Sequence, residues 1–89
     1  MSREHLSTAS DLLREAAETS DEAAAERLAG FADRLDRMAG ADRDPDHGKM
    51  ASVLLKLDEI ADGLDEAEAA TVQEAREHVT AFRETVSGV

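Results

Sequence analysis

The chain of 89 residues contains no cysteine, no tryptophan and no tyrosine, and it has one proline and two phenylalanines. Without cysteine it can form no disulfide, thiolate nucleophile or thiolate metal site. It also lacks an apolar run of about 20 residues, the length that a helix needs to cross a bilayer. No apolar segment follows its first five residues, as it would in a signal peptide. These absences predict a cytoplasmic protein that is not bound to a membrane.

Positive charge is scarce. The chain has 10 basic against 21 acidic residues, which gives a formal net charge of -11. Such a surface repels phosphate groups unless a local cluster of basic residues overcomes the repulsion. No such cluster is visible along the sequence. We therefore expect no direct binding to nucleic acid.

Large apolar side chains are also few, since Leu, Ile, Val and Phe together make up 17 residues. A low share with high net charge is typical of disorder. However, the chain also has 17 alanines, which favour helices, and its large apolar residues recur at spacings of three and four. No segment alternates with a period of two, so no strand is expected. The expected helices span residues 3–18, 21–39, 45–63 and 66–87.

Several residues mark the expected ends of these helices. Thr19 precedes Glu22 by three residues and Asp65 precedes Glu68 by three, which is the spacing of a capping box. Residues 44–46, Asp-Pro-Asp, place a cap, a proline and a carboxylate at the start of the third helix. Glycines at positions suited to a left-handed C-terminal residue are Gly40, Gly63 and Gly88.

The pattern predicts a single all-α domain, 1–89, built as an antiparallel four-helix bundle. Residues 9–14 resemble residues 51–56, and residues 21–23 resemble residues 65–67. This similarity arises either from duplication of one helical hairpin or by chance in a chain rich in Ala, Glu and Asp. The residues expected at its centre are Leu28, Phe31, Leu35, Leu54, Leu57, Ile60, Val79 and Phe82.

The composition is typical of proteins that work in concentrated salt. Eight of the ten basic residues are Arg, and the acidic excess occurs together with abundant Ala and few large apolar residues. Residues 45–51, PDHGKMA, open a helix ahead of a leucine-rich stretch. In this motif, over residues 43–64, and in composition, the chain resembles small acidic all-helical proteins of unknown function from halophilic archaea. The resemblance implies a halophilic archaeal source and a helical fold, and it supplies no catalytic residues.

A calcium loop is the first metal site to consider. Asp42, Asp44 and Asp46 have the spacing of the first ligands in such a loop. However, His47 occupies the position that needs Gly, and Val53 occupies the position of the bidentate Glu. Helix capping and solvation explain these aspartates better than calcium does.

Other catalytic or cofactor sites are not indicated. His5, His47 and His78 lie on different expected helices, and no pair has the sequence spacing of metal ligands. No glycine elbow or oxyanion loop accompanies a nucleophile. We therefore predict no enzyme activity, no metal and no cofactor.

One enzyme class remains as an alternative, the small helical mutases that clamp a dicarboxylate substrate with cationic side chains. Acidic neighbours within one turn, Glu18 for Arg14 and Asp33 for Arg37, favour surface ion pairs over this role. The cations available for such a clamp are Arg14, Arg34, Arg37 and Lys56.

The preferred interpretation is a non-enzymatic helical module that acts through protein contacts, as a homodimer and with a possible unknown protein partner. Leu55 lies nearly opposite the apolar stripe of Leu57 and Ile60, so packing inside one bundle does not easily explain it. The alternatives to a dimer are a fourth helix that crosses over to cover Leu55, or a monomer with one surface leucine. The expected interface is on the third or first helix, with Leu55, Ala51 and Leu13. The rival interpretation is a mimic of nucleic-acid charge, or a regulatory partner of a basic protein, whose carboxylates would form one continuous face.

Overall fold

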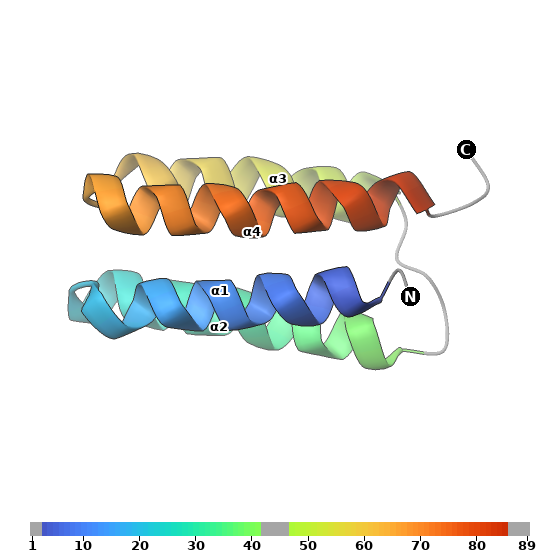
Figure 1. Ribbon diagram of the computed structural model, residues 1–89, viewed down its shortest axis with the longest axis horizontal. Coiled ribbons are helices and arrows are strands. Elements are labelled where there is room, and N and C mark those ends of the chain that lie inside the picture. Colours follow the sequence, from blue (N-terminus) through green and yellow to red (C-terminus); the bar gives the residue numbers. More distant parts are fainter. Residues whose placement is uncertain (1–2, 42–46, 86–89) are drawn as a thin grey trace.

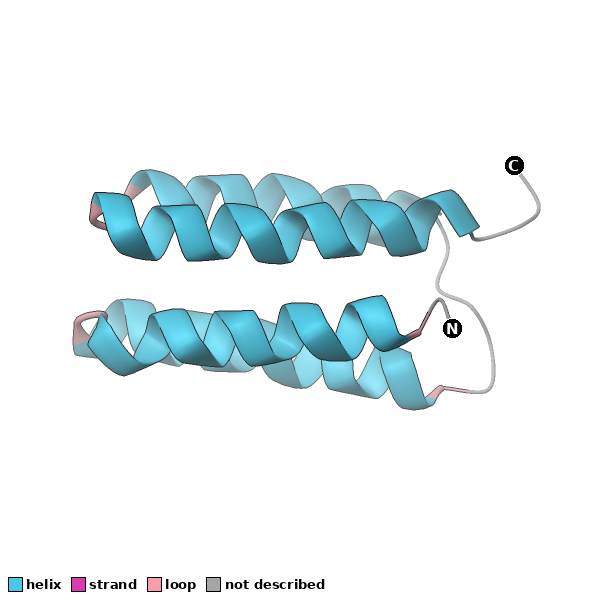
Figure 2. Ribbon diagram, in the orientation of Figure 1, coloured by secondary structure: helices cyan, strands magenta, loops and turns pink. Residues whose placement is uncertain are grey.

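The computed structural model describes residues 3–41 and 47–85, and this part of the chain is helical without any strand. The four helices are α1 (Glu4–Thr19), α2 (Glu22–Gly40), α3 (His47–Asp62) and α4 (Glu66–Thr85). Each predicted helix end lies within two residues of the observed one. Short turns join α1 to α2 and α3 to α4 (Figure 2).

Successive helices run antiparallel and form two hairpins that lie against each other (Figure 1). α1 packs against both α2 and α4, and α3 packs against α4. The contact between α2 and α3 is far smaller than any of these three. The predicted antiparallel four-helix bundle is confirmed, and the joint between its hairpins runs mainly along α1 and α4.

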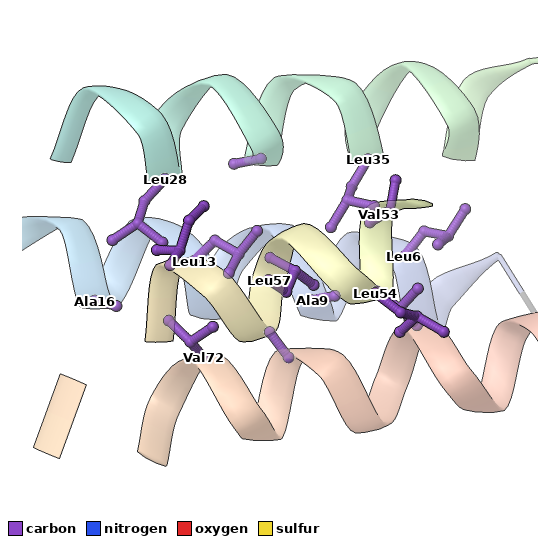
Figure 3. Close-up of a cluster of buried hydrophobic side chains, with 14 of the residues drawn as sticks. Leu6, Ala9, Leu13, Ala16, Leu28, Leu35, Val53, Leu54, Leu57 and Val72 are labelled. Atoms are coloured by element: carbon purple, nitrogen blue, oxygen red, sulfur yellow. The ribbon is translucent and has the colours of Figure 1, made fainter. Parts of the chain in front are cut away.

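The predicted core is confirmed with one exception. Seven of the eight residues expected at the centre are buried, and Phe31 is only partly buried. Phe31 lies at the edge of the apolar stripe of α2, on the flank turned away from α1. α3 should cover this flank but contacts α2 only slightly. Figure 3 shows several of the buried side chains, among them Leu13, Leu28, Leu35 and Leu57, which converge between the helices.

Small side chains occupy several points where helices meet. Ala9, Ala16, Ala32 and Ala75 are all buried. Ser10, which is fully buried, donates a hydrogen bond of 3.2 Å from its hydroxyl to the carbonyl oxygen of Ala32, and this bond joins α1 to α2. The small residues allow close approach of the helix backbones, so the bundle can pack with few large side chains.

The structure corrects one of the two predicted capping boxes. Asp21, not Thr19, caps α2, since its carboxylate accepts a hydrogen bond of 2.9 Å from the amide of Ala24. The Thr19 hydroxyl instead donates to the carbonyl of Ala16 in its own helix. Asp65 caps α4 as predicted, through a bond of 2.8 Å from the amide of Glu68. The short loop places Asp21 closer to the free amides, and Thr19 still belongs to α1.

Helix C-termini also differ from the expectation. Neither Gly40 nor Gly63 has the left-handed backbone that the sequence suggested. α2 ends with Gly40 inside the helix and with Ala41 extended, and the amide of Ala41 donates to Met38 at 3.3 Å. The expected start at residues 44–46 and the terminal Gly88 lie outside the described residues.

We expect Asp21→Ala and Asp65→Ala each to lower the free energy of unfolding by about 1 kcal/mol, because each leaves a first-turn amide without its acceptor. Asp21→Asn removes the same charge but keeps an acceptor oxygen, so its loss should be much smaller. Thr19→Ala should also have little effect. Urea unfolding followed by circular dichroism measures all four variants. A loss in Thr19→Ala as large as that in Asp21→Ala would contradict the observed cap.

Candidate functional site

The outer side of α3 carries the one exposed large apolar side chain among the described residues. Leu55 is 61% exposed. Gly48, Ala51 and Ser52 are exposed on the same side of the helix. Residues 47–57 contain no Asp or Glu, although the chain as a whole has 21. We refer to Gly48, Ala51, Ser52 and Leu55 as the α3 surface. It is small, uncharged and weakly apolar within an acidic molecule.

Two of the three residues expected at an interface lie on the α3 surface, namely Leu55 and Ala51. Leu13 does not share their position. It is fully buried in the core of a single chain, on α1, and therefore offers no area to a second copy. The spacing of Leu6, Ala9, Leu13 and Ala16 itself places Leu13 on the apolar face of α1, and their burial agrees with this spacing.

A cluster of basic side chains lies on the opposite flank of α2 from α1. Arg27 and Arg34 are exposed on this flank, Arg37 is exposed beside it on the outer face of α2, and Lys56 is exposed on α3. None of the four makes an ion pair or a hydrogen bond with the described residues. The guanidinium carbon of Arg34 lies 5.3 Å from the ring centroid of Phe31. We refer to these four basic residues as the cationic patch.

The cationic patch is not visible along the sequence because acidic residues separate its members in the chain. On a helix, residues at intervals of three, four and seven share a face. The carboxylates between Arg27 and Arg37 are those of Asp33 and Asp36, and they point toward α1, where they meet Arg14. The helical period therefore separates the charges of α2 into two flanks.

Arg14 is held by two carboxylates of α2. Its Nη2 lies 2.7 Å from Asp33 Oδ1 and 3.0 Å from Asp36 Oδ2. The hydrogen bond with Asp36, followed by the charges of Asp36 and Asp33, raises the pKa of Arg14 above its usual value. The expected pairs of Arg14 with Glu18 and of Arg37 with Asp33 are not formed, because Arg14 reaches across to α2 instead.

This arrangement gives the mutase-type clamp no support. Arg14 is already engaged by carboxylates on the α1–α2 flank, whereas Arg34 lies on the other flank of α2 and Arg37 on its outer face. A described surface hollow lies along α4 and contains none of the four candidate cations. The residues that line it are Gln73, Arg76, Glu77, Thr80, Ala81 and Glu84.

Two of the three histidines meet in the fold. The Nδ1 atoms of His5 and His78 are 3.0 Å apart, and their ring centroids are 5.3 Å apart with the planes tilted by 38°. One ring donates an N–H to the other, and the contact joins α1 to α4. Sequence spacing gave no signal for this pair, since 73 residues separate its members. The side chain of His47 and the aspartates at 42, 44 and 46 lie outside the described residues.

No group of three or more His, Asp or Glu side chains in residues 3–41 and 48–85 is placed to hold a metal ion. Within the same part of the chain, every helix is too short or too polar to cross a membrane.

Comparison with known proteins identifies a matching family. The model of a family of unknown function, DUF7553, matches residues 1–85. No curated protein and no solved structure matches the chain. Since the match covers nearly the whole sequence, the chain belongs to the family of unknown function DUF7553.

Proposed function

We propose that the chain is a non-enzymatic protein-interaction module of a halophilic archaeon, and that it forms a homodimer through the α3 surface. The observation that carries this proposal is the exposure of Leu55 within a stretch free of carboxylates, in a molecule that otherwise exposes acidic residues on every helix. A twofold axis would bring the same surface of two chains together.

The size of the side chains suits such a contact. Gly48 and Ala51 lie on the same side of α3 as Leu55, and they leave room for a leucine of the second copy. Complete burial of a leucine contributes about 1.5–3 kcal/mol. Because residues 47–57 carry no carboxylate, two highly acidic molecules can meet there with the least repulsion. Salt screens the repulsion between the acidic remainders of the two molecules, so association should strengthen with salt.

The distribution of carboxylates favours salt adaptation over nucleic-acid mimicry. Exposed acidic residues occur on all four helices, for example Asp11, Glu26, Glu59 and Glu74. A mimic needs one continuous acidic face along the molecule. Here the cationic patch interrupts the acidic surface on α2 and α3, while the other acidic residues spread around the bundle. A hydrated surface in the cytoplasm of a halophile accounts for this arrangement.

Sedimentation equilibrium tests the dimer. In about 1 M salt, where the Debye length is about 3 Å, we expect the wild type to sediment as a dimer and Leu55→Asp as a monomer. Ala70→Asp adds the same charge at an exposed position of α4 and should remain dimeric. Circular dichroism shows whether each variant is folded. A monomeric wild type contradicts the dimer, and a folded, dimeric Leu55→Asp contradicts the role of the α3 surface.

A further inference from the structure

We propose that the cationic patch, together with the ring of Phe31, binds an acidic amphipathic helix of a partner protein. The inference deepens and rests on the proposed interaction role but centres on a different part of the surface, since Leu55 and Lys56 are about 100° apart around α3. The side of the bundle between α2 and α3 is where neighbouring helices contact each other least. Phe31 remains partly exposed on this side.

The basic residues surround Phe31. On α2, Arg27 lies four residues before Phe31 and Arg34 lies three after it, so each is one helical turn away. Phe31 is nine residues from the last residue of α2, and Lys56 is nine residues from the first residue of α3. Because these helices are antiparallel, Phe31 and Lys56 lie at the same level of the bundle.

The side-chain contacts of α3 place Lys56 toward α2. Asp58 of α3 pairs with Arg76 of α4 at 2.9 Å, so the flank of Asp58 faces α4. Lys56 precedes Asp58 by two residues, which places it on the opposite flank of the helix. The other neighbour of α3 is α2. The cationic patch therefore borders one side of the bundle rather than two separate surfaces.

The lack of partners for these cations is unusual in a chain with twice as many acidic as basic residues. Neither Arg27 nor Arg34 has an acidic residue three or four positions away on α2, although Glu22, Glu26 and Asp33 belong to the same helix. Guanidinium groups that are not engaged within the molecule can each accept a carboxylate in a bidentate contact. The patch is thus complementary to a surface that presents carboxylates.

The spacing and the apolar centre fit a helix. From Arg27 to Arg37 the patch extends over ten residues, which is about 15 Å of helix. Carboxylates two turns apart on a bound helix would match Arg27 and Arg34, and an apolar residue between them would contact Phe31. Nucleic acid fits less well, because its phosphates carry a higher charge density, which a molecule of net charge -11 repels more strongly, and because its backbone offers no apolar side chain to Phe31.

The test uses a fluorescent synthetic peptide that forms an amphipathic helix with leucines on one face and glutamates beside them. Fluorescence anisotropy is measured with the full chain in about 0.1 M and about 1 M salt. We expect the wild type to bind this peptide but not its glutamine analogue. Arg27→Gln, Arg34→Gln and Lys56→Gln combined should weaken binding by at least about tenfold.

A matched variant separates this surface from net charge. Ser7→Glu, Thr8→Glu and Ala70→Glu combined lower the net charge by the same amount, at exposed positions of α1 and α4. This variant should bind the acidic peptide nearly as well as the wild type. Equal weakening in both variants overturns the proposal, and so does failure of the wild type to bind the peptide.

Two further measurements complete the test. If a DNA duplex binds more tightly than the peptide and displaces it, the proposal of an acidic helix as the ligand is overturned in favour of nucleic acid. Leu55→Asp should bind the peptide nearly as the wild type does, because Leu55 points about 100° away from Lys56 around α3. If the homodimer is absent while the peptide still binds at the cationic patch, the proposed dimer fails and this inference stands.

Discussion

Replacing Leu57 by alanine is expected to lower the free energy of unfolding by about 2–5 kcal/mol, the usual cost of removing a buried leucine and leaving a cavity. Leu57 is fully buried on α3 and lies among the other core side chains (Figure 3). Small domains have marginal stability, and the core here contains few large residues. The variant should therefore be largely unfolded in low salt.

Leu55→Ala is the matched control for this prediction, since it makes the same chemical change two residues away on the same helix. Leu55 is 61% exposed, so the expected change is within about 0.5 kcal/mol. Urea unfolding followed by circular dichroism, at a protein concentration low enough to prevent association, compares the two variants. Similar losses in both would contradict the observed orientation of α3.

Raising the salt concentration from about 0.1 M to about 1 M should stabilise the fold, because the Debye length falls from about 10 Å to about 3 Å. Carboxylates one turn apart repel each other along the helices, as do Asp11 with Glu15 and Glu22 with Glu26. Each such pair costs about 0.2–0.5 kcal/mol. Several pairs together give about 2 kcal/mol, which corresponds to a rise of about 10 °C in Tm for a domain of this size.

Thermal melts in potassium chloride test this expectation. A combined variant, Glu15→Gln, Glu18→Gln and Glu74→Gln, removes three exposed carboxylates from α1 and α4 and should be more stable in low salt and less dependent on salt. If salt leaves the Tm of the wild type unchanged or lowers it, repulsion among carboxylates does not limit the stability of the fold.

The helices could be predicted because the residues that determine where each helix forms and begins lie close together in the sequence. Apolar residues at intervals of three and four specify each helix, and Asp65 lies at the cap position of α4. The sequence shows three possible acceptors in succession, Thr19, Ser20 and Asp21, without showing where α1 ends, and the capping-box spacing to Glu22 favours Thr19. Only the observed loop decides in favour of Asp21.

The candidate surfaces were harder to predict because they depend on how helices pair. Periodicity alone identified Leu55 as a residue outside the core. It could not show that α2 and α3 make little contact, which leaves Phe31 partly exposed. The contact of His5 with His78 arises only because α1 and α4 are neighbours. Such pairings follow from topology, which spacing along one helix does not encode.

The alanines at the helix contacts also affect how stability varies with temperature. A methyl group buries little apolar surface, so unfolding of this bundle exposes less such surface than unfolding of a leucine-filled core of the same length. Apolar exposure is the source of the positive heat-capacity change of unfolding. The heat-capacity change should thus be small for 89 residues, and the curve of stability against temperature should be shallow and broad.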